Sequence, residues 1–164
     1  MNAVEAEVLA LADALRRRGW RLASAESCTG GLIAAACTAV AGSSDWFERG
    51  FVTYSNAAKS EMLGVDPALI AAQGAVSEAV VQAMARGAVD RAEVELGVAV
   101  TGIAGPGGAT AGKPVGTVWL AVAVRDAGDY IQVRAERLQL DGDRSAVREQ
   151  TVRQALQRLR EAAA

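Results

Sequence analysis

The sequence predicts an α/β protein, a three-layer α/β/α sandwich built around a mixed, mostly parallel sheet. Apolar strand-like runs alternate along the chain with segments of helical periodicity, which is the pattern of a parallel sheet covered by helices on both faces. Near the C-terminus, two strand-like runs follow each other across an Ala-Gly-Asp turn, which is typical of an antiparallel hairpin. We expect all 164 residues to form one domain.

Helix and strand signals alternate from the N-terminus onward. Apolar residues recur at helical spacing over 4–18, and Gly19 ends that predicted helix. Ser55 is a favoured cap for a short helix that ends at Leu63, and Asp66 with the proline after it is a favoured start for another. The remaining elements predicted before residue 95 are strands at 20–26 and 49–54 and helices at 29–40 and 76–89.

The last third of the chain supplies the other strands. Residues 95–101 are almost all apolar, which is typical of a central strand that helices cover on both faces. A Gly-rich loop follows this run. The remaining predicted elements are strands at 115–124 and 130–140, which form the hairpin, and a helix at 145–160 that Asp141 or Asp143 caps.

Composition excludes several classes of protein. A net charge of −2 indicates neither nucleic-acid binding nor binding to a membrane surface. The longest apolar run, residues 32–41, is too short to span a bilayer, and acids stand near the N-terminus where a secretion signal carries bases. We therefore expect a cytoplasmic protein with reduced thiols, in which Cys28 and Cys37 do not pair with each other.

The chain contains no histidine, and this limits its chemistry. Ser-His-Asp and Cys-His catalysis and His-containing metal sites are excluded, and two cysteines are too few for structural zinc. We expect neither a metal nor a cofactor. Among 17 basic residues only Lys59 and Lys113 are lysines. A desolvated lysine, unlike an arginine, can lose its proton and act as a base.

The Gly-rich loop fails two nucleotide-binding motifs. From Gly107 it matches G-x-x-x-x-G-K, but Pro114 stands where a Ser or Thr would bind magnesium, and a strand follows instead of a helix. The dinucleotide-binding pattern fails because Gly105 and Gly107 lack a Gly or Ala at position 110. We expect the loop at the ligand-binding edge of the sheet, and a long surface connection is the alternative.

Residues 25–31, Ala-Glu-Ser-Cys-Thr-Gly-Gly, link the first strand to the second helix. Ser27 lies at this turn, where free N–H groups and the helix dipole favour negative charge; taken alone, the pattern favours a helix cap. A nucleophilic Ser27 needs an activator other than histidine. Lys59 follows the next strand, so its amine can reach the same sheet edge, and Tyr54 can relay a proton or orient Lys59.

Two neighbours of Ser27 have alternative interpretations. Cys28 is a rival nucleophile, because a thiol in the first turn of a helix has a lowered pKa. Its side chain is expected about 100° around the helix from Ser27, and we favour a small core residue. Glu26 is a candidate metal ligand or supporting residue, although a single acid is a weak indication of a metal site.

Five blocks of sequence resemble the CinA C-terminal domain family, in order and over nearly the whole chain. They read A-E-S-C-T-G-G-L-I-A, F-V-T-Y-S-N-A-A-K with L-G-V, G-A-V-S-E, T-G-I-A-G-P and K-P-V-G-T-V-W. The resemblance implies an α/β fold. It also implies hydrolysis of the carboxamide of nicotinamide mononucleotide to nicotinate mononucleotide and ammonia, in pyridine nucleotide recycling.

The same resemblance implies roles for individual residues. Ser27 is the implied nucleophile, Lys59 its base, and Tyr54 an assisting residue. The residues implied to bind the nucleotide substrate are Cys28, Thr29, Gly30, Thr101, Gly102, Gly105 and Arg144. The apolar, Ala-rich composition makes a homodimer the expected assembly. Two alternatives stay open: a non-catalytic nucleotide-binding or interaction module linked to competence or DNA repair, and hydrolysis of a different amide.

Overall fold

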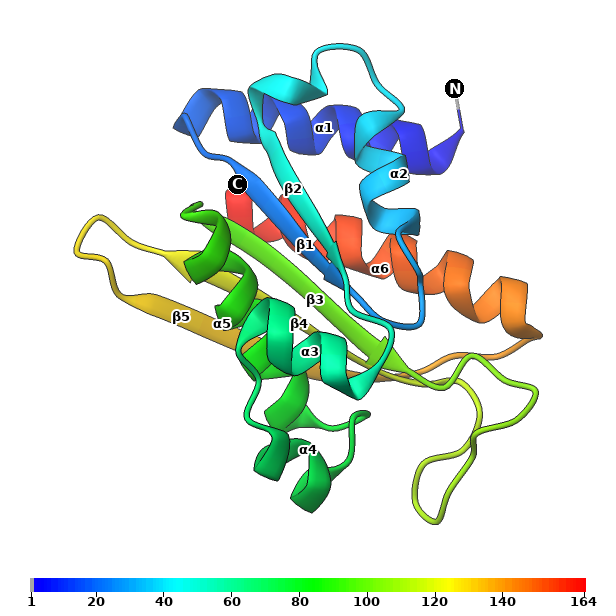
Figure 1. Cartoon of the computed structure of the whole chain (residues 1–164). Coiled ribbons are helices and arrows are strands. Elements are labelled where there is room, and N and C mark those ends of the chain that lie inside the picture. Colours follow the sequence, from blue (N-terminus) through cyan, green and yellow to red (C-terminus); the bar gives the residue numbers. More distant parts are fainter. Residues whose placement is uncertain (1) are drawn as a thin grey trace.

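A five-stranded sheet lies between two layers of helices in the computed structural model, which describes residues 2–164 (Figure 1). The strands are β1 (Leu22–Glu26), β2 (Phe47–Val52), β3 (Leu96–Gly102), β4 (Thr117–Arg125) and β5 (Ile131–Gln139). The helices are α1 (Ala3–Arg18), α2 (Leu32–Thr38), α3 (Asn56–Leu63), α4 (Pro67–Gln73), α5 (Glu78–Ala92) and α6 (Arg144–Ala163), with a 3-10 turn, η1 (Ser43–Asp45). The predicted α/β sandwich is confirmed.

The strands are ordered β2-β1-β3-β4-β5. β1 pairs in parallel with β2 and β3, whereas β4 pairs antiparallel with both β3 and β5. The sheet is therefore mixed, and only β4 runs against the other strands. β1 is buried along its whole length, and β3 is buried up to its last residue. The burial of β3 confirms the prediction from its continuous apolar run, which is typical of a strand covered on both faces.

Two hydrophobic cores lie on opposite faces of the sheet. α1, α2 and α6 cover one face with large side chains such as Leu11, Ile33 and Leu156. α3, α4 and α5 cover the other face, where the strands present mainly alanines. Small residues let α5 lie close to the sheet: a Cβ on Gly97 would lie 2.6 Å from a methyl carbon of Val89. Figure 1 shows the two layers on either side of the strands.

Two predicted boundaries shift at the functionally important edge. α2 begins at Leu32, three residues later than predicted, because Gly30 and Gly31 take left-handed φ angles of 59° and 108°. Ser27 is therefore not the cap of this helix. β2 ends at Val52, two residues earlier than predicted, although the amide of Thr53 still donates to the carbonyl of Glu26 in β1.

The C-terminal third follows the prediction closely. β4 and β5 form the expected antiparallel hairpin across the turn between Arg125 and Ile131. Asp143 caps α6, since its carboxylate accepts a hydrogen bond from the amide of Ala146. Both cysteines are free and buried, as expected. Within residues 2–164, no helix is both long enough and apolar enough to cross a membrane.

Candidate active site

Three parallel strands end side by side at one edge of the sheet. The register places Glu26, the last residue of β1, between Val52 of β2 and Val100 of β3. The residues that follow these positions therefore meet at this edge, as expected for parallel strands. Ser27 is the first residue after β1, and its amide donates to the carbonyl of Val100. Lys59 lies in the first turn of α3, after the loop that follows β2.

Lys59 brings its amine against Ser27. The Nζ atom lies 3.0 Å from the Ser27 hydroxyl oxygen and contacts the carbonyl oxygens of Thr53 at 3.0 Å and Tyr54 at 3.4 Å. The lysine side chain is almost completely buried, with 1% exposed, and burial lowers the pKa of its amine. Both carbonyls belong to the segment that links β2 to α3.

The three neighbours of this amine are all oxygen atoms that can accept a hydrogen bond. A protonated amine can donate to all three, whereas a neutral amine has two hydrogens and one lone pair. In the neutral form the two carbonyls take the hydrogens, because they can only accept, and the lone pair faces the hydroxyl proton of Ser27. The contacts therefore fit both an ammonium that donates to Ser27 and a neutral amine that accepts its proton.

Cys28 does not have the properties of a competing nucleophile. Burial raises the pKa of its thiol to about 11, so little thiolate exists near neutral pH. The expected lowering of this pKa by a helix N-terminus is wrong, because α2 begins four residues after Cys28. The interpretation of Cys28 as a small buried residue, 7% exposed, agrees with the structure.

Glu26 anchors the turn that carries Ser27. Its fully buried carboxylate accepts hydrogen bonds from the Thr29 hydroxyl at 2.6 Å and from the amides of Ile33 at 2.8 Å and Ala34 at 3.0 Å. Glu26 thus caps α2 from the preceding strand, the role that the sequence suggested for Ser27. Within the described chain, no group of three or more His, Cys, Asp and Glu side chains is placed to hold a metal ion.

A pocket of about 230 Å³ opens over the serine and lysine. Its lining residues are Ser27, Cys28, Tyr54, Asn56, Lys59, Ala75, Val76, Thr101, Gly102, Ala104 and Arg144. Seven of the predicted site residues are in this set. Three others are not: Thr29 is buried against Glu26, Gly30 lies in the turn, and Gly105 offers its carbonyl to Arg144.

Arg144 joins two loops at the pocket. Its guanidinium donates to the carbonyl of Gly105 at 2.8 Å and to the hydroxyl of Tyr54 at 3.1 Å. Tyr54 therefore contacts Lys59 through its backbone carbonyl, while its side chain, 62% exposed, contacts Arg144. The backbone carbonyl and the side chain of Tyr54 therefore have different partners, whereas the sequence predicted a single role for this residue.

Four pocket residues were missed from the sequence. Asn56 stands between Tyr54 and Lys59 in the Y-S-N-A-A-K block, and this position was its only signal. Ala75 and Val76 belong to the G-A-V-S-E block, where the sequence predicted that Val76 begins a helix; α5 begins only at Glu78, so both residues lie in the segment before it. A hydrogen bond of 3.0 Å from the Thr101 hydroxyl to the Ala75 carbonyl brings that block to the end of β3. The fourth residue is Ala104, in the loop after β3.

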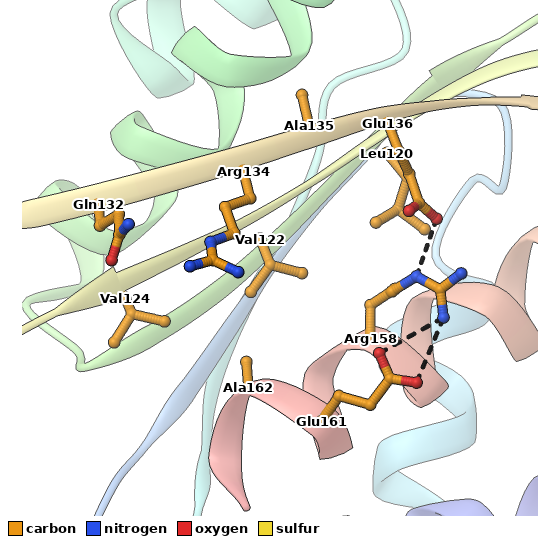
Figure 2. A pocket seen from close by; sticks show the side chains of 10 residues that line it. All are labelled: Leu120, Val122, Val124, Gln132, Arg134, Ala135, Glu136, Arg158, Glu161 and Ala162. Atoms are coloured by element: carbon orange, nitrogen blue, oxygen red, sulfur yellow. Dashed lines mark hydrogen bonds and ion pairs between the residues drawn. The ribbon is translucent and has the colours of Figure 1, made fainter.

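A larger hollow of about 540 Å³ lies elsewhere, between β4, β5 and α6 (Figure 2). Arg158 occupies its polar side, where it contacts Glu136 at 2.9 Å and Glu161 at 3.4 Å. Figure 2 shows the guanidinium between these two carboxylates. None of the ten lining residues is a Ser, Cys or Lys, so this hollow lacks a nucleophile and a base of the kind found at Ser27.

A serine hydroxyl beside a buried amine, at the carboxyl ends of parallel strands, defines a candidate serine–lysine site on an α/β fold. The chain belongs to the CinA C-terminal domain family, whose model matches residues 4–163. The resemblance noted in the sequence is confirmed.

Curated relatives match most of this chain. The nicotinamide-nucleotide amidohydrolase PncC of Pseudomonas putida is 55% identical over 146 residues, which cover 89% of this chain and 88% of that protein. The protein of the same name from Escherichia coli K12 is 52% identical over 147 residues, covering 90% and 87%. A crystal structure of a CinA superfamily protein from Klebsiella pneumoniae superposes with a TM-score of 0.92 at 40% identity, covering 99% and 98% of the two chains.

Proposed function

We propose that this protein hydrolyses the carboxamide of nicotinamide mononucleotide, releasing nicotinate mononucleotide and ammonia, as a step in pyridine nucleotide recycling. The observation that carries the proposal is the 3.0 Å contact between the buried Lys59 amine and the Ser27 hydroxyl inside a pocket. The amidohydrolases named above support the choice of substrate, because they match nearly the whole chain at 52–55% identity.

The proposed reaction begins with attack of Ser27 on the carboxamide carbon. As the new C–O bond forms, the hydroxyl proton passes to neutral Lys59 and the carbonyl oxygen becomes an oxyanion. Lys59 then returns the proton to the amide nitrogen, the C–N bond breaks, and ammonia leaves. Ser27 is left as an ester of the nicotinate group.

The second half of the proposed reaction regenerates the enzyme. Lys59 takes a proton from water, the hydroxide attacks the ester, and the C–O bond to Ser27 breaks as the serine oxygen recovers the proton from Lys59. Tyr54 assists through its carbonyl, which accepts from Lys59, and through its hydroxyl, which contacts Arg144. Arg144 and the Gly-rich loop hold the phosphate in this proposal, so that binding energy comes from a part of the substrate remote from the reaction.

The decisive experiment follows ammonia release from nicotinamide mononucleotide by wild type, Lys59→Arg and Ser27→Ala. Arginine keeps the positive charge but cannot act as a base, so we expect Lys59→Arg to lose at least about 100-fold in kcat. Arg17→Lys is the control, because Arg17 is exposed on α1 and does not line the pocket, so this variant should keep wild-type activity.

The possible results separate the candidate functions. Near wild-type turnover by Lys59→Arg contradicts the assigned base. Binding of nicotinamide mononucleotide by the wild type without ammonia release supports a nucleotide-binding module instead. Release of ammonia only from other amides supports a different substrate.

A further inference from the structure

Arg148 holds the turn of Ser27 from the face of the sheet opposite Lys59. It extends from α6, and its Nε and Nη2 atoms each donate at 3.1 Å to neighbouring carbonyls, those of Cys28 and Thr29. The side chain is half-buried, and Lys59 comes from α3 in the other helical layer. Sequence reasoning did not single out Arg148.

Some backbone amides of this turn are hydrogen-bonded within the protein, and others are not. Gly30 donates its amide hydrogen to the Ser27 carbonyl at 3.1 Å. At the start of α2, Leu32 donates to the Thr29 carbonyl, and Ile33 and Ala34 donate to Glu26. Those helix amides are therefore not free to bind an oxyanion, contrary to the expectation from the sequence. Among the described residues, no backbone or side-chain oxygen accepts from the amide of Cys28, which directly follows the nucleophile and belongs to a residue that lines the pocket. Thr29 is fully buried and outside the pocket lining, so its amide cannot reach a bound substrate.

Peptide geometry links the Cys28 amide to the hydrogen bonds of the turn. In a trans peptide the carbonyl of one residue and the amide N–H of the next point in opposite directions. Because Gly30 holds the Ser27 carbonyl, the N–H of Cys28 points away from Gly30. Arg148 holds the next carbonyl, that of Cys28, and so restrains the peptide plane on the other side of the same residue. Glu26 holds the far end of the turn through the Thr29 hydroxyl, so the peptide planes are restrained at both ends.

We propose that Arg148 is a positioning residue that sets the peptide planes of this turn so that the amide of Cys28 binds the oxyanion. The proposal rests on the amidohydrolase function above, because only an acyl-transfer reaction creates that oxyanion. Arginine suits the role because its rigid fork can donate to two adjacent carbonyls at once, which a lysine ammonium cannot do with the same geometry.

The kinetic test compares Arg148→Met and Arg148→Lys with Arg153→Met. Oxyanion binding acts only in the transition state, so Arg148→Met should lower kcat about 100-fold with KM changed by less than about threefold. Arg148→Lys should recover part of the loss. Arg153 is exposed on the same helix and faces a different groove, so Arg153→Met should match wild type.

A purely structural role of Arg148 would give different results in these measurements. If Arg148 only ties α6 to the turn, Arg148→Met lowers the thermal midpoint while kcat stays close to wild type, or kcat and KM change together. Either result overturns the oxyanion role. Arg148→Lys gives the same comparison with a milder change should Arg148→Met fail to fold.

A second measurement does not depend on turnover. Hydrogen exchange at the amide of Gly30, whose hydrogen bond to Ser27 closes the turn, should be faster in Arg148→Met and unchanged in Arg153→Met. Unchanged exchange in Arg148→Met overturns the positioning role even if the enzyme is active. If the wild type releases no ammonia, the proposed function fails, and exchange at Gly30 still decides whether Arg148 positions the turn.

Discussion

The surroundings of the Lys59 amine distinguish it from an ordinary surface lysine. Its amine lies within hydrogen-bonding distance of two backbone carbonyls and of the Ser27 hydroxyl. In the neutral form the carbonyls take both hydrogens, and the lone pair faces the hydroxyl. Burial lowers the pKa of Lys59, which makes the neutral form accessible at lower pH than for an exposed lysine. The same residue type at position 113 is held by one carbonyl at the surface and has no such environment.

The pH dependence of the reaction should report this environment. The base form of Lys59 is deprotonated, so its population rises as pH rises through the pKa. We expect kcat/KM for ammonia release to rise with pH and reach a plateau below 10.5, the ordinary value for lysine. A value of kcat/KM that falls as the pH is raised toward 10.5, or that begins to rise only near 10.5, contradicts a neutral Lys59 base. Arg17→Lys should leave the profile unchanged.

At the residue scale, the sequence predicted the partners but not their exact geometry. The pairing of Ser27 with Lys59 followed from two strands that end at one edge. The sequence did not predict that Glu26 caps α2. The two glycines make α2 begin later than expected, and its first amides then lie within reach of the Glu26 carboxylate instead of the Ser27 hydroxyl. The raised pKa of Cys28 also depends on burial that no local pattern encodes.

At the element scale, α3 and α5 cross with almost no space between them. A Cβ on Gly87, inside α5, would lie 2.1 Å from the carbonyl oxygen of Leu63 at the end of α3. Glycine is normally a poor helix residue, so its presence here reflects this close approach. The contact matters for function because it fixes α3, the helix that carries Lys59.

Gly87→Ala should therefore destabilise the protein despite the better helix propensity of alanine. We expect a loss of about 1–3 kcal/mol in the free energy of unfolding, measured by urea denaturation, because the backbone of α3 has to move. Gly107→Ala is the control, since no heavy atom lies within 4 Å of its added Cβ. A Gly87→Ala variant as stable as wild type would show that the helices separate at little cost.

At the scale of the whole molecule, the site depends on both helical layers. Lys59 comes from the layer of α3, α4 and α5, whereas Arg148 comes from the layer of α1, α2 and α6. Both act on the few residues after β1. Both layers pack on the buried central strands. A shift of either layer against the sheet would therefore change how Lys59 or Arg148 contacts the turn that carries Ser27.

The homodimer expected from composition stays a prediction. Sedimentation velocity over a range of protein concentrations should give a mass of about twice the 16.9 kDa of one chain. A sedimenting mass of one chain at all concentrations would contradict the prediction. A mass above that of two chains would point to a larger assembly.

The sequence by itself determined the alternation of strands and helices, the edge where the functional residues gather, and membership of the CinA C-terminal domain family. These features are encoded in local periodicity, in capping residues and in short blocks of residues. Only the tertiary structure placed Ala75 beside Thr101 and Arg148 beside Cys28, which are 26 and 120 positions apart. Such contacts depend on how two layers pack across a sheet, and no local pattern carries that information.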